Sequence, residues 1–169
     1  EEEIKAVEEC LRDGCVAGFG PRTIEFEEKI AKFFGKKYGV FVNSGSAACL
    51  LALASLQLPK GTKIITPACT FSTTLAPIIQ LGLIPVFVDV DLGQILDAVT
   101  DDVKALMIPN LIGNKPNWKA LKKGLIQMGR EDIILVEDSA DTVTYTEETD
   151  IATTSFYASH VITAGGAGG

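Results

Sequence analysis

The sequence has little of the side-chain chemistry that builds metal centres or disulfide frameworks. It contains one histidine, His160, and its four cysteines form no Cys-x-x-Cys pair and have no histidine at ligand spacing. Structural zinc sites and disulfide frameworks depend on closely spaced ligands or on cysteine-dense chains. We therefore expect no metal site and no disulfide framework, with Cys10, Cys15, Cys49 and Cys69 as reduced, buried thiols.

Positive charge is also in short supply. Lysine and arginine number 15 against 22 aspartates and glutamates, which gives a formal net charge of −7. Binding to nucleic acid needs a clustered positive surface that neutralises phosphates, so this composition argues against a nucleic-acid partner. A small anionic ligand stays open, because a few backbone amides at a helix start can hold one phosphate.

Long apolar segments are absent as well. The longest apolar run lies around residues 84–90 (IPVFVDV) and is too short to span a bilayer. The acidic stretch EEEIKAVEEC has neither the basic flank nor the apolar core of a signal peptide. We therefore expect a cytoplasmic protein with no membrane partner.

Hydrophobic side chains are abundant. They make up 47% of the 169 residues, enough for one domain with a sizeable core. Short apolar runs typical of buried strands alternate with helix-like stretches. The expected strands are 38–42, 63–66, 84–90, 105–109 and 132–138, and the expected helices are 23–34, 47–58, 71–81 and 118–129. This alternation predicts an α/β domain whose mostly parallel sheet is covered by helices on both faces.

A first motif with chemical potential is NSGSAA at residues 43–48, between an expected strand and an expected helix. Free amides at a helix start, with the hydroxyls of Ser44 and Ser46, would suit a phosphate. An ordinary N-cap, in which one of these serines only satisfies backbone donors, is the alternative.

A second motif, LVEDSAD, places Glu137 and Asp138 at the carboxyl end of an expected strand. Open α/β sheets bind ligands at that edge, where a carboxylate could pair with a protonated ring nitrogen of a cofactor. The alternative is a solvated helix start capped by Asp138 or Ser139.

The third motif is the closing stretch SFYASHVITAGGAGG, in which Ser155 lies five residues before His160. Imidazole titrates near neutrality and therefore suits proton transfer. A lone histidine can equally be a packed or surface residue, and the motif alone does not decide between these roles.

Taken together and in this order, four segments resemble the DegT/DnrJ/EryC1/StrS family: NSGSAACLLALASL, IITPACTFSTTLAPIIQLGLIPVFVDVD, LVEDSAD and TTSFYASHVITAGGAGG. Members of that family are vitamin-B6-dependent sugar-nucleotide aminotransferases and dehydratases of the aspartate-aminotransferase fold (fold type I). The resemblance covers the chain from about Gly20 onward. It implies pyridoxal 5'-phosphate or pyridoxamine 5'-phosphate as the cofactor.

The resemblance also implies roles for five residues. Gly45 and Ser46 would hold the cofactor phosphate, and Ser155 would add a second hydroxyl. Phe71 lies where the family stacks an aromatic side chain on the pyridine ring. Asp138 would pair with the pyridinium nitrogen and keep the ring an electron sink.

His160 stands where most of the family carries the lysine that forms a Schiff base with pyridoxal phosphate. Imidazole has no primary amine, but it can take and return protons. With this substitution the chain resembles the sugar-nucleotide 3-dehydratase branch, which holds pyridoxamine phosphate non-covalently. The resemblance implies that His160 is the catalytic base of an enzyme that removes the C3 hydroxyl of a nucleotide-linked 4-keto-6-deoxyhexose, in deoxysugar or lipopolysaccharide biosynthesis.

Three features depart from the family pattern. Residues 165–169 read GGAGG without the family's glutamate, the stretch between Asp141 and Ser155 is shorter, and Val161 stands where relatives carry a polar residue. Two other functions stay open. One is a pyridoxal-phosphate-dependent sugar-nucleotide aminotransferase, which would need a lysine near position 160. The other is a cofactor- or sugar-nucleotide-binding protein without catalysis.

Family members continue beyond the last residue of this sequence, so we expect part of a longer protein. Residues 1–20 would form an N-terminal helical segment and residues 21–169 part of the cofactor-binding large domain. Family active sites lie at a dimer interface, and the expected helix 47–58 has almost no polar face to leave uncovered, so we expect a homodimer. The resemblance further implies a nucleotide-sugar substrate and a reductase partner, with low or no activity of the isolated chain.

Overall fold

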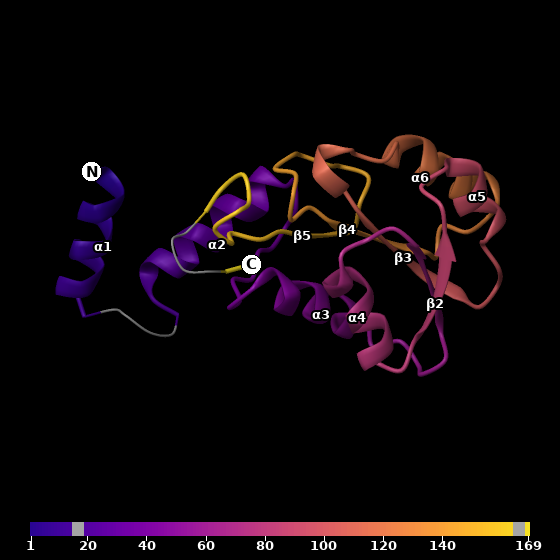
Figure 1. The fold of residues 1–169 in the computed structure, drawn as a ribbon, viewed down its shortest axis with the longest axis horizontal. Coiled ribbons are helices and arrows are strands. Elements are labelled where there is room, and N and C mark those ends of the chain that lie inside the picture. Colours follow the sequence, from indigo (N-terminus) through magenta and orange to yellow (C-terminus); the bar gives the residue numbers. More distant parts are fainter. Residues whose placement is uncertain (15–18, 164–167) are drawn as a thin grey trace.

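The computed structural model describes residues 1–14, 19–163 and 168–169. Its centre is a five-stranded sheet in the order β2-β1-β3-β4-β5 (Figure 1). All four neighbouring pairs are parallel. The strands are β1 (Lys63–Pro67), β2 (Ile84–Val88), β3 (Val103–Pro109), β4 (Ile134–Asp138) and β5 (Ile151–Thr153). The predicted α/β class with a parallel sheet is confirmed.

Helices lie in three of the four connections between successive strands, as is usual for parallel pairing, and residues 139–150 connect β4 to β5 without a helix. The helices are α4 (Ser72–Gln80) between β1 and β2, α5 (Leu92–Asp97) between β2 and β3, and the short η1 (Leu111–Gly113) followed by α6 (Trp118–Gln127) between β3 and β4. The chain passes from β2 across β1 to reach β3. The direction of winding therefore reverses between β1 and β3, where open α/β sheets form ligand sites.

Two hydrophobic cores flank the sheet, because neighbouring strand residues point to opposite faces. Ile64 and Ile65 are both fully buried, and each belongs to a different core. Helices α3 (Gly45–Ser55) and α4 cover one face and α5 and α6 the other (Figure 1). The prediction of helices on both faces is confirmed.

The expected strand at residues 38–42 is wrong. The structure has no strand there, and Tyr38 and Val40 are 76% and 68% exposed. Val42 exchanges backbone hydrogen bonds of 2.8 and 3.1 Å with Gly169, and the Phe41 amide donates to the Glu27 side chain at 2.7 Å. A β-branched and aromatic composition therefore does not make a strand where the backbone lacks a neighbour along its length.

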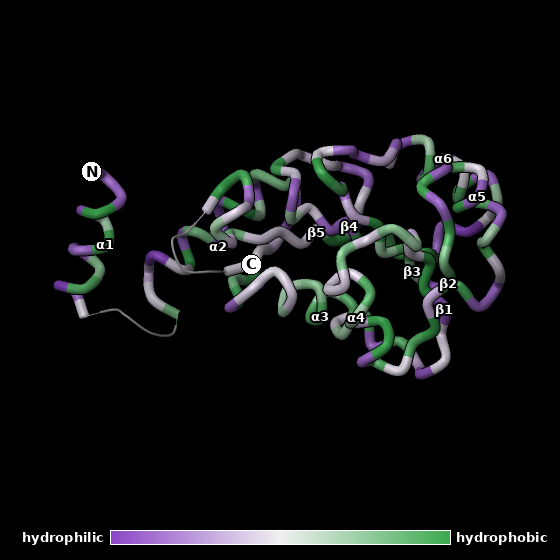
Figure 2. Tube along the Cα trace, viewed as in Figure 1, coloured by the Kyte–Doolittle hydropathy of each residue, from purple (hydrophilic) through white to green (hydrophobic). Residues whose placement is uncertain are grey.

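The amino-terminal part holds two helices, α1 (Glu2–Arg12) and α2 (Pro21–Phe33). Helix α1 has no buried residue, and polar and apolar residues alternate along it in Figure 2. Its apolar side chains Ile4, Val7 and Leu11 are exposed. One ion pair of 3.3 Å, between Glu9 and Arg22, joins α1 to α2.

The thiols are less uniform than expected. Cys49 is buried, Cys10 is half-buried and Cys69 is exposed, so the expectation of buried thiols is wrong for Cys69. Cys15 lies outside the described residues. Within the described ranges, no helix combines the length and the apolar composition that crossing a bilayer requires.

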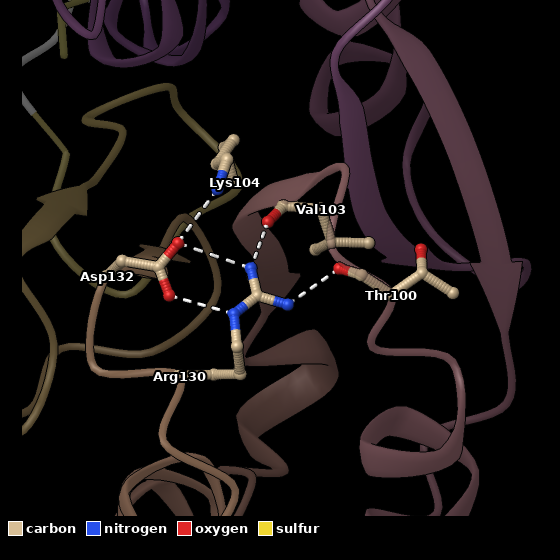
Figure 3. Close-up of polar contacts among 5 residues, drawn as sticks. All are labelled: Thr100, Val103, Lys104, Arg130 and Asp132. Atoms are coloured by element: carbon tan, nitrogen blue, oxygen red, sulfur yellow. Dashed lines mark hydrogen bonds and ion pairs between the residues drawn. The ribbon is translucent and has the colours of Figure 1, made fainter.

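An ion-pair cluster fixes the amino ends of β3 and β4 (Figure 3). The Arg130 guanidinium donates to the carbonyls of Thr100 (2.6 Å) and Val103 (2.7 Å) and to the Asp132 carboxylate (2.8 Å), which also accepts from Lys104. Hydrogen bonding by Arg130, and then by Lys104, holds the pKa of Asp132 well below its usual range. This cluster lies at the sheet edge opposite to the carboxyl ends of the strands.

Candidate functional site

A pocket of about 470 Å³ opens where the carboxyl ends of the strands meet the start of α3. Segments that follow β1, β3, β4 and β5 contribute to its wall. This is the edge that the winding of the sheet predicts for a ligand site. The structure brings together in it all six residues singled out from the sequence: Gly45, Ser46, Phe71, Asp138, Ser155 and His160.

The start of α3 forms one wall. The Ser44 hydroxyl accepts from the Ala47 amide at 3.2 Å, so Ser44 is an N-cap, as the ordinary interpretation of the motif expected. Gly45 and Ser46 follow in the first turn, where backbone amides have no acceptor within the helix. A helix start whose free amides line a pocket also favours an anion.

Gly45 allows this wall to approach Ser155. A Cβ atom at position 45 would lie 2.7 Å from the Ser155 Cβ, closer than packed atoms come. Ser155 is 9% exposed and its hydroxyl accepts from the Tyr157 amide at 3.3 Å. The close contact places a serine hydroxyl beside the start of α3, although the two residues are far apart in the sequence.

Asp138 points from the end of β4 into the pocket. It is 7% exposed, and its Oδ2 accepts from the Thr74 hydroxyl at 2.8 Å and from the Cys49 thiol at 3.6 Å. The Ala140 amide donates to Oδ1 at 3.2 Å. A turn rather than a helix follows, so the alternative of a solvated helix start is wrong. A buried carboxylate held on one side is suited to a cationic ligand atom.

Cys49 and Thr74 are site residues that the sequence interpretation missed. Both lie on the inner faces of helices, α3 and α4, and both contact Asp138. Burial, followed by the charge of Asp138, raises the pKa of Cys49 to about 12. The thiol therefore stays protonated at neutral pH and acts as a donor to Asp138.

His160 follows β5 and lines the same pocket. Its Nδ1 is 3.4 Å from Asp141 Oδ1, and its ring meets that of Tyr157 edge to face at 6.2 Å between centroids. Its side chain is 19% exposed. Asp141 was also missed, although the spacing in EDSAD, three residues after Asp138, already placed it at the same strand end.

Phe71 precedes α4 and lines the pocket while remaining 66% exposed. Gly168 also lines it, and its carbonyl accepts from the Phe156 amide at 2.8 Å. Gly165 and Gly166 of the GGAGG stretch lie outside the described residues. No lysine is among the described residues that form the pocket wall.

Fold and site together define an α/β protein with a ligand pocket at the winding reversal of a parallel sheet. Comparison with known sequences makes this specific. The chain belongs to the DegT/DnrJ/EryC1/StrS aminotransferase family, whose signature matches residues 1–169. The family resemblance noted from the motifs is confirmed.

Two curated relatives are sugar-nucleotide 3-dehydratases. GDP-4-keto-6-deoxy-D-mannose 3-dehydratase of Escherichia coli O55:H7 is 37% identical over 182 residues, which cover 95% of this chain and 46% of the relative. The dTDP-4-dehydro-2,6-dideoxy-D-glucose 3-dehydratase of Saccharopolyspora spinosa is 38% identical over 191 residues, covering 99% and 40%. The chain thus spans less than half the length of these relatives.

Solved structures show the same fold. The Escherichia coli GDP-4-keto-6-deoxy-D-mannose-3-dehydratase with bound hydrated pyridoxal phosphate superposes with a TM-score of 0.85 at 36% identity. The superposition covers 98% of this chain and 47% of that one. The expected fold of the aspartate-aminotransferase type is therefore confirmed.

Proposed function

We propose that this chain is the cofactor-binding part of a sugar-nucleotide 3-dehydratase that uses pyridoxamine phosphate. The reaction removes the C3 hydroxyl of a nucleotide-linked 4-keto-6-deoxyhexose in deoxysugar or lipopolysaccharide biosynthesis. One observation carries the proposal: His160, and no lysine, lines the described wall of a pocket that also contains Asp138. The names of the 3-dehydratase relatives support the same reaction.

The residues present fit this cofactor. A phosphate would be held by the amides of Gly45 and Ser46 at the start of α3 and by the hydroxyls of Ser46 and Ser155, which the missing Cβ of Gly45 allows to converge. Asp138 would pair with the ring nitrogen, and the exposed Phe71 would stack on the ring. When bound, pyridoxamine phosphate supplies an amine that condenses with a ketone and a ring that accepts electrons.

His160 would act as the base. Asp141 faces Nδ1, so that nitrogen keeps its proton and Nε2 is free to take one. In this site Nε2 would take up the proton released at the C4' carbon of the bound cofactor and return it to the C3 hydroxyl, which would leave as water. A lysine at position 160 would instead bind pyridoxal phosphate covalently, which is the chemistry of an aminotransferase.

The division of the chain and its partners follow from the same proposal. Residues 1–20 would be an N-terminal helical segment and residues 21–169 part of the cofactor-binding domain. A homodimer is supported by apolar side chains that remain exposed on α1, α2 and the 38–41 segment: Ile4, Val7, Leu11, Ile24, Phe33, Tyr38 and Val40. The nucleotide sugar would be the substrate, a reductase would act on the product, and the protein would be cytoplasmic.

A turnover experiment tests the proposed reaction. The full-length enzyme of which this chain is proposed to be a part would be incubated with pyridoxamine phosphate and nucleotide-linked 4-keto-6-deoxyhexoses. Loss of the C3 hydroxyl would be followed by NMR and mass spectrometry. We expect elimination in the wild type and none with His160→Asn, whose smaller amide side chain stays polar but cannot act as a base. Amino transfer to the sugar without C3 elimination would contradict the proposal.

A further inference from the structure

Glu137 is a carboxylate for which the proposed reaction has no use, and it is fully buried. It directly precedes Asp138 on β4, so the two side chains point to opposite faces of the sheet. Asp138 contacts Cys49 and Thr74 on one face. Glu137 therefore holds the same strand end from the other face.

Three side-chain donors satisfy the Glu137 carboxylate. Asn110 Nδ2 and Thr146 Oγ1 donate to Oε2 at 3.0 and 2.9 Å, and Thr149 Oγ1 donates to Oε1 at 3.0 Å. Burial of a carboxylate is unfavourable unless such partners replace water. A network of this kind rigidifies the groups that form it when every member is satisfied.

Asn110 connects this network to the pocket. It is fully buried, lines the pocket, and its backbone amide donates to the Asp138 carbonyl at 2.8 Å. Its Oδ1 accepts from Trp118 Nε1 at 3.2 Å, which fixes the orientation of the amide and leaves Nδ2 for Glu137. Glu137 thus accepts a hydrogen bond from the Asn110 side chain, and the Asn110 backbone amide donates to the Asp138 carbonyl.

Three lysines donate hydrogen bonds to the loop 145–149, which contains Thr146 and Thr149. Lys36 Nζ donates to Thr149 Oγ1 and to the Thr146 carbonyl, both at 2.8 Å. Lys115 and Lys122 donate to the carbonyls of Tyr145 and Glu148 at 2.6 and 2.9 Å. Desolvation lowers the pKa of Lys36, and the charge of Glu137 opposes that shift. The Lys36 ammonium therefore lies one hydroxyl away from the buried carboxylate.

We propose that Glu137 is a positioning residue that, with Asn110 and the lysine-held loop 145–149, fixes the Asp138 carboxylate for a cationic ligand atom in the pocket. The inference rests on the proposed function for the identity of that ligand, since Asp138 would face the ring nitrogen of the cofactor. The orientation of Asp138 itself can be measured without any ligand.

The test compares Glu137→Gln with Glu147→Gln, an exposed residue of the same loop that loses the same charge. Glutamine keeps the shape of Glu137 but turns one acceptor into a donor, which leaves an amide facing the Asn110 amide or a threonine hydroxyl. The first measurement is the ¹³C signal of the Asp138 carboxyl carbon in ligand-free protein, assigned with Asp138→Asn. We expect this signal to move in Glu137→Gln and to stay unchanged in Glu147→Gln.

The second measurement is binding of pyridoxamine phosphate, followed by absorbance. We expect Kd to rise at least tenfold, with a displaced absorbance band, in Glu137→Gln only. Thr149→Val removes one donor without touching the carboxylate and serves if Glu137→Gln does not fold; it should shift both readouts in the same direction by a smaller amount.

The outcomes separate the two proposals. A lower Tm with unchanged Asp138 signal, Kd and band would show that Glu137 is only structural and would overturn the inference. If wild-type protein binds no cofactor while the Asp138 signal still moves in Glu137→Gln, the proposed function fails and the positioning role stands.

Discussion

Asp141 Oδ1 lies 3.4 Å from His160 Nδ1, so the single histidine of the chain meets a carboxylate inside the pocket that also holds Asp138. The contact joins the turn after β4 to the segment after β5. The two nitrogens of an imidazole have different roles, and a carboxylate at one of them selects which nitrogen carries the proton. The contact between Asp141 and Nδ1 therefore leaves Nε2 of His160 as the nitrogen that can accept a proton in the pocket.

Replacing Asp141 tests this orientation. We expect Asp141→Asn to lower the rate of C3 elimination by about tenfold or more, since a general base contributes roughly 10²–10⁴ and loses part of this when misoriented. Binding of pyridoxamine phosphate should change little, because Asp141 faces His160 and not the expected phosphate or ring-nitrogen sites. Asp97→Asn, at an exposed position on α5, is the control. Equal rates in the two variants would refute the orienting role.

The Thr74 hydroxyl should matter for cofactor affinity. Its 2.8 Å hydrogen bond to Asp138 is lost in Thr74→Val, a change that keeps the shape of the side chain. We expect Kd for pyridoxamine phosphate to rise about five- to tenfold, as for a hydrogen bond worth roughly 1 kcal/mol. Thr73→Val changes a neighbouring pocket residue that makes no hydrogen bond to the Asp138 side chain and should bind like the wild type. If absorbance titration gives the same Kd for Thr74→Val and the wild type, this result would count against a role of Asp138 in binding the cofactor.

The Cys49 thiol makes stability depend on alkaline pH. Burial raises its pKa from 9.0 to about 12, so the folded protein keeps a proton that the unfolded chain releases. The stabilising contribution is complete below about pH 8.5 and is lost as the pH rises toward 12. Cys49→Ala should therefore flatten the fall in unfolding free energy between about pH 8.5 and 10.5, measured with urea.

Cys69→Ala provides the comparison, because Cys69 is exposed. The unfolding free energy of Cys69→Ala should fall with pH as steeply as that of the wild type. If the unfolding free energy falls equally with pH in the wild type, Cys49→Ala and Cys69→Ala, then Cys49 does not hold its proton in the folded state.

The cluster around Arg130 should affect stability and leave the pocket alone (Figure 3). Arg130→Ala removes the donors to the Thr100 and Val103 carbonyls, and we expect a loss of about 1–2 kcal/mol in unfolding free energy. Arg12→Ala, exposed on α1, should cost much less. Cofactor affinity should be unchanged, because the cluster lies at the amino ends of the strands. Weaker cofactor binding in Arg130→Ala would show that the two edges of the sheet are coupled.

The same cluster makes the free energy of unfolding depend on pH in the acid range. The pKa of Asp132 is held low by Arg130, so its contribution is present above the ordinary carboxylate range and is lost as the pH falls. Urea unfolding between about pH 5 and 2 measures how far the free energy of unfolding falls on acidification. This fall should be smaller in Arg130→Ala than in Arg12→Ala.

Much of the fold could be predicted because it rests on local patterns. The strands β1, β3 and β4 each contain a short apolar run, which is typical of strands buried on both faces. Helix α5, with six residues, and strand β5, with three, are too short to show a period, and both were missed. The segment 38–42 had strand composition but lacks the neighbouring backbone that a strand requires.

The site was predictable to the extent that its residues belong to motifs. Gly45, Asp138, Ser155 and His160 lie in recognisable stretches, and the structure gathers them in one pocket. Thr74, Cys49 and Asn110 carry no such signal, because their importance comes from residues distant in the sequence that they contact only in the folded protein. The burial of Glu137 was equally invisible, since a glutamate next to Asp138 at a strand end looks like a solvated residue.

The measurement that tests the account most directly is an absorbance titration of the purified protein and of His160→Lys with pyridoxal phosphate and pyridoxamine phosphate. We expect the wild type to bind pyridoxamine phosphate and to form no covalent adduct with pyridoxal phosphate after borohydride treatment. His160→Lys should gain a borohydride-trapped adduct at residue 160, detected by peptide mass. If neither protein binds either cofactor, or if the wild type itself forms the covalent adduct, the assignment of this pocket to a non-covalently held cofactor is contradicted.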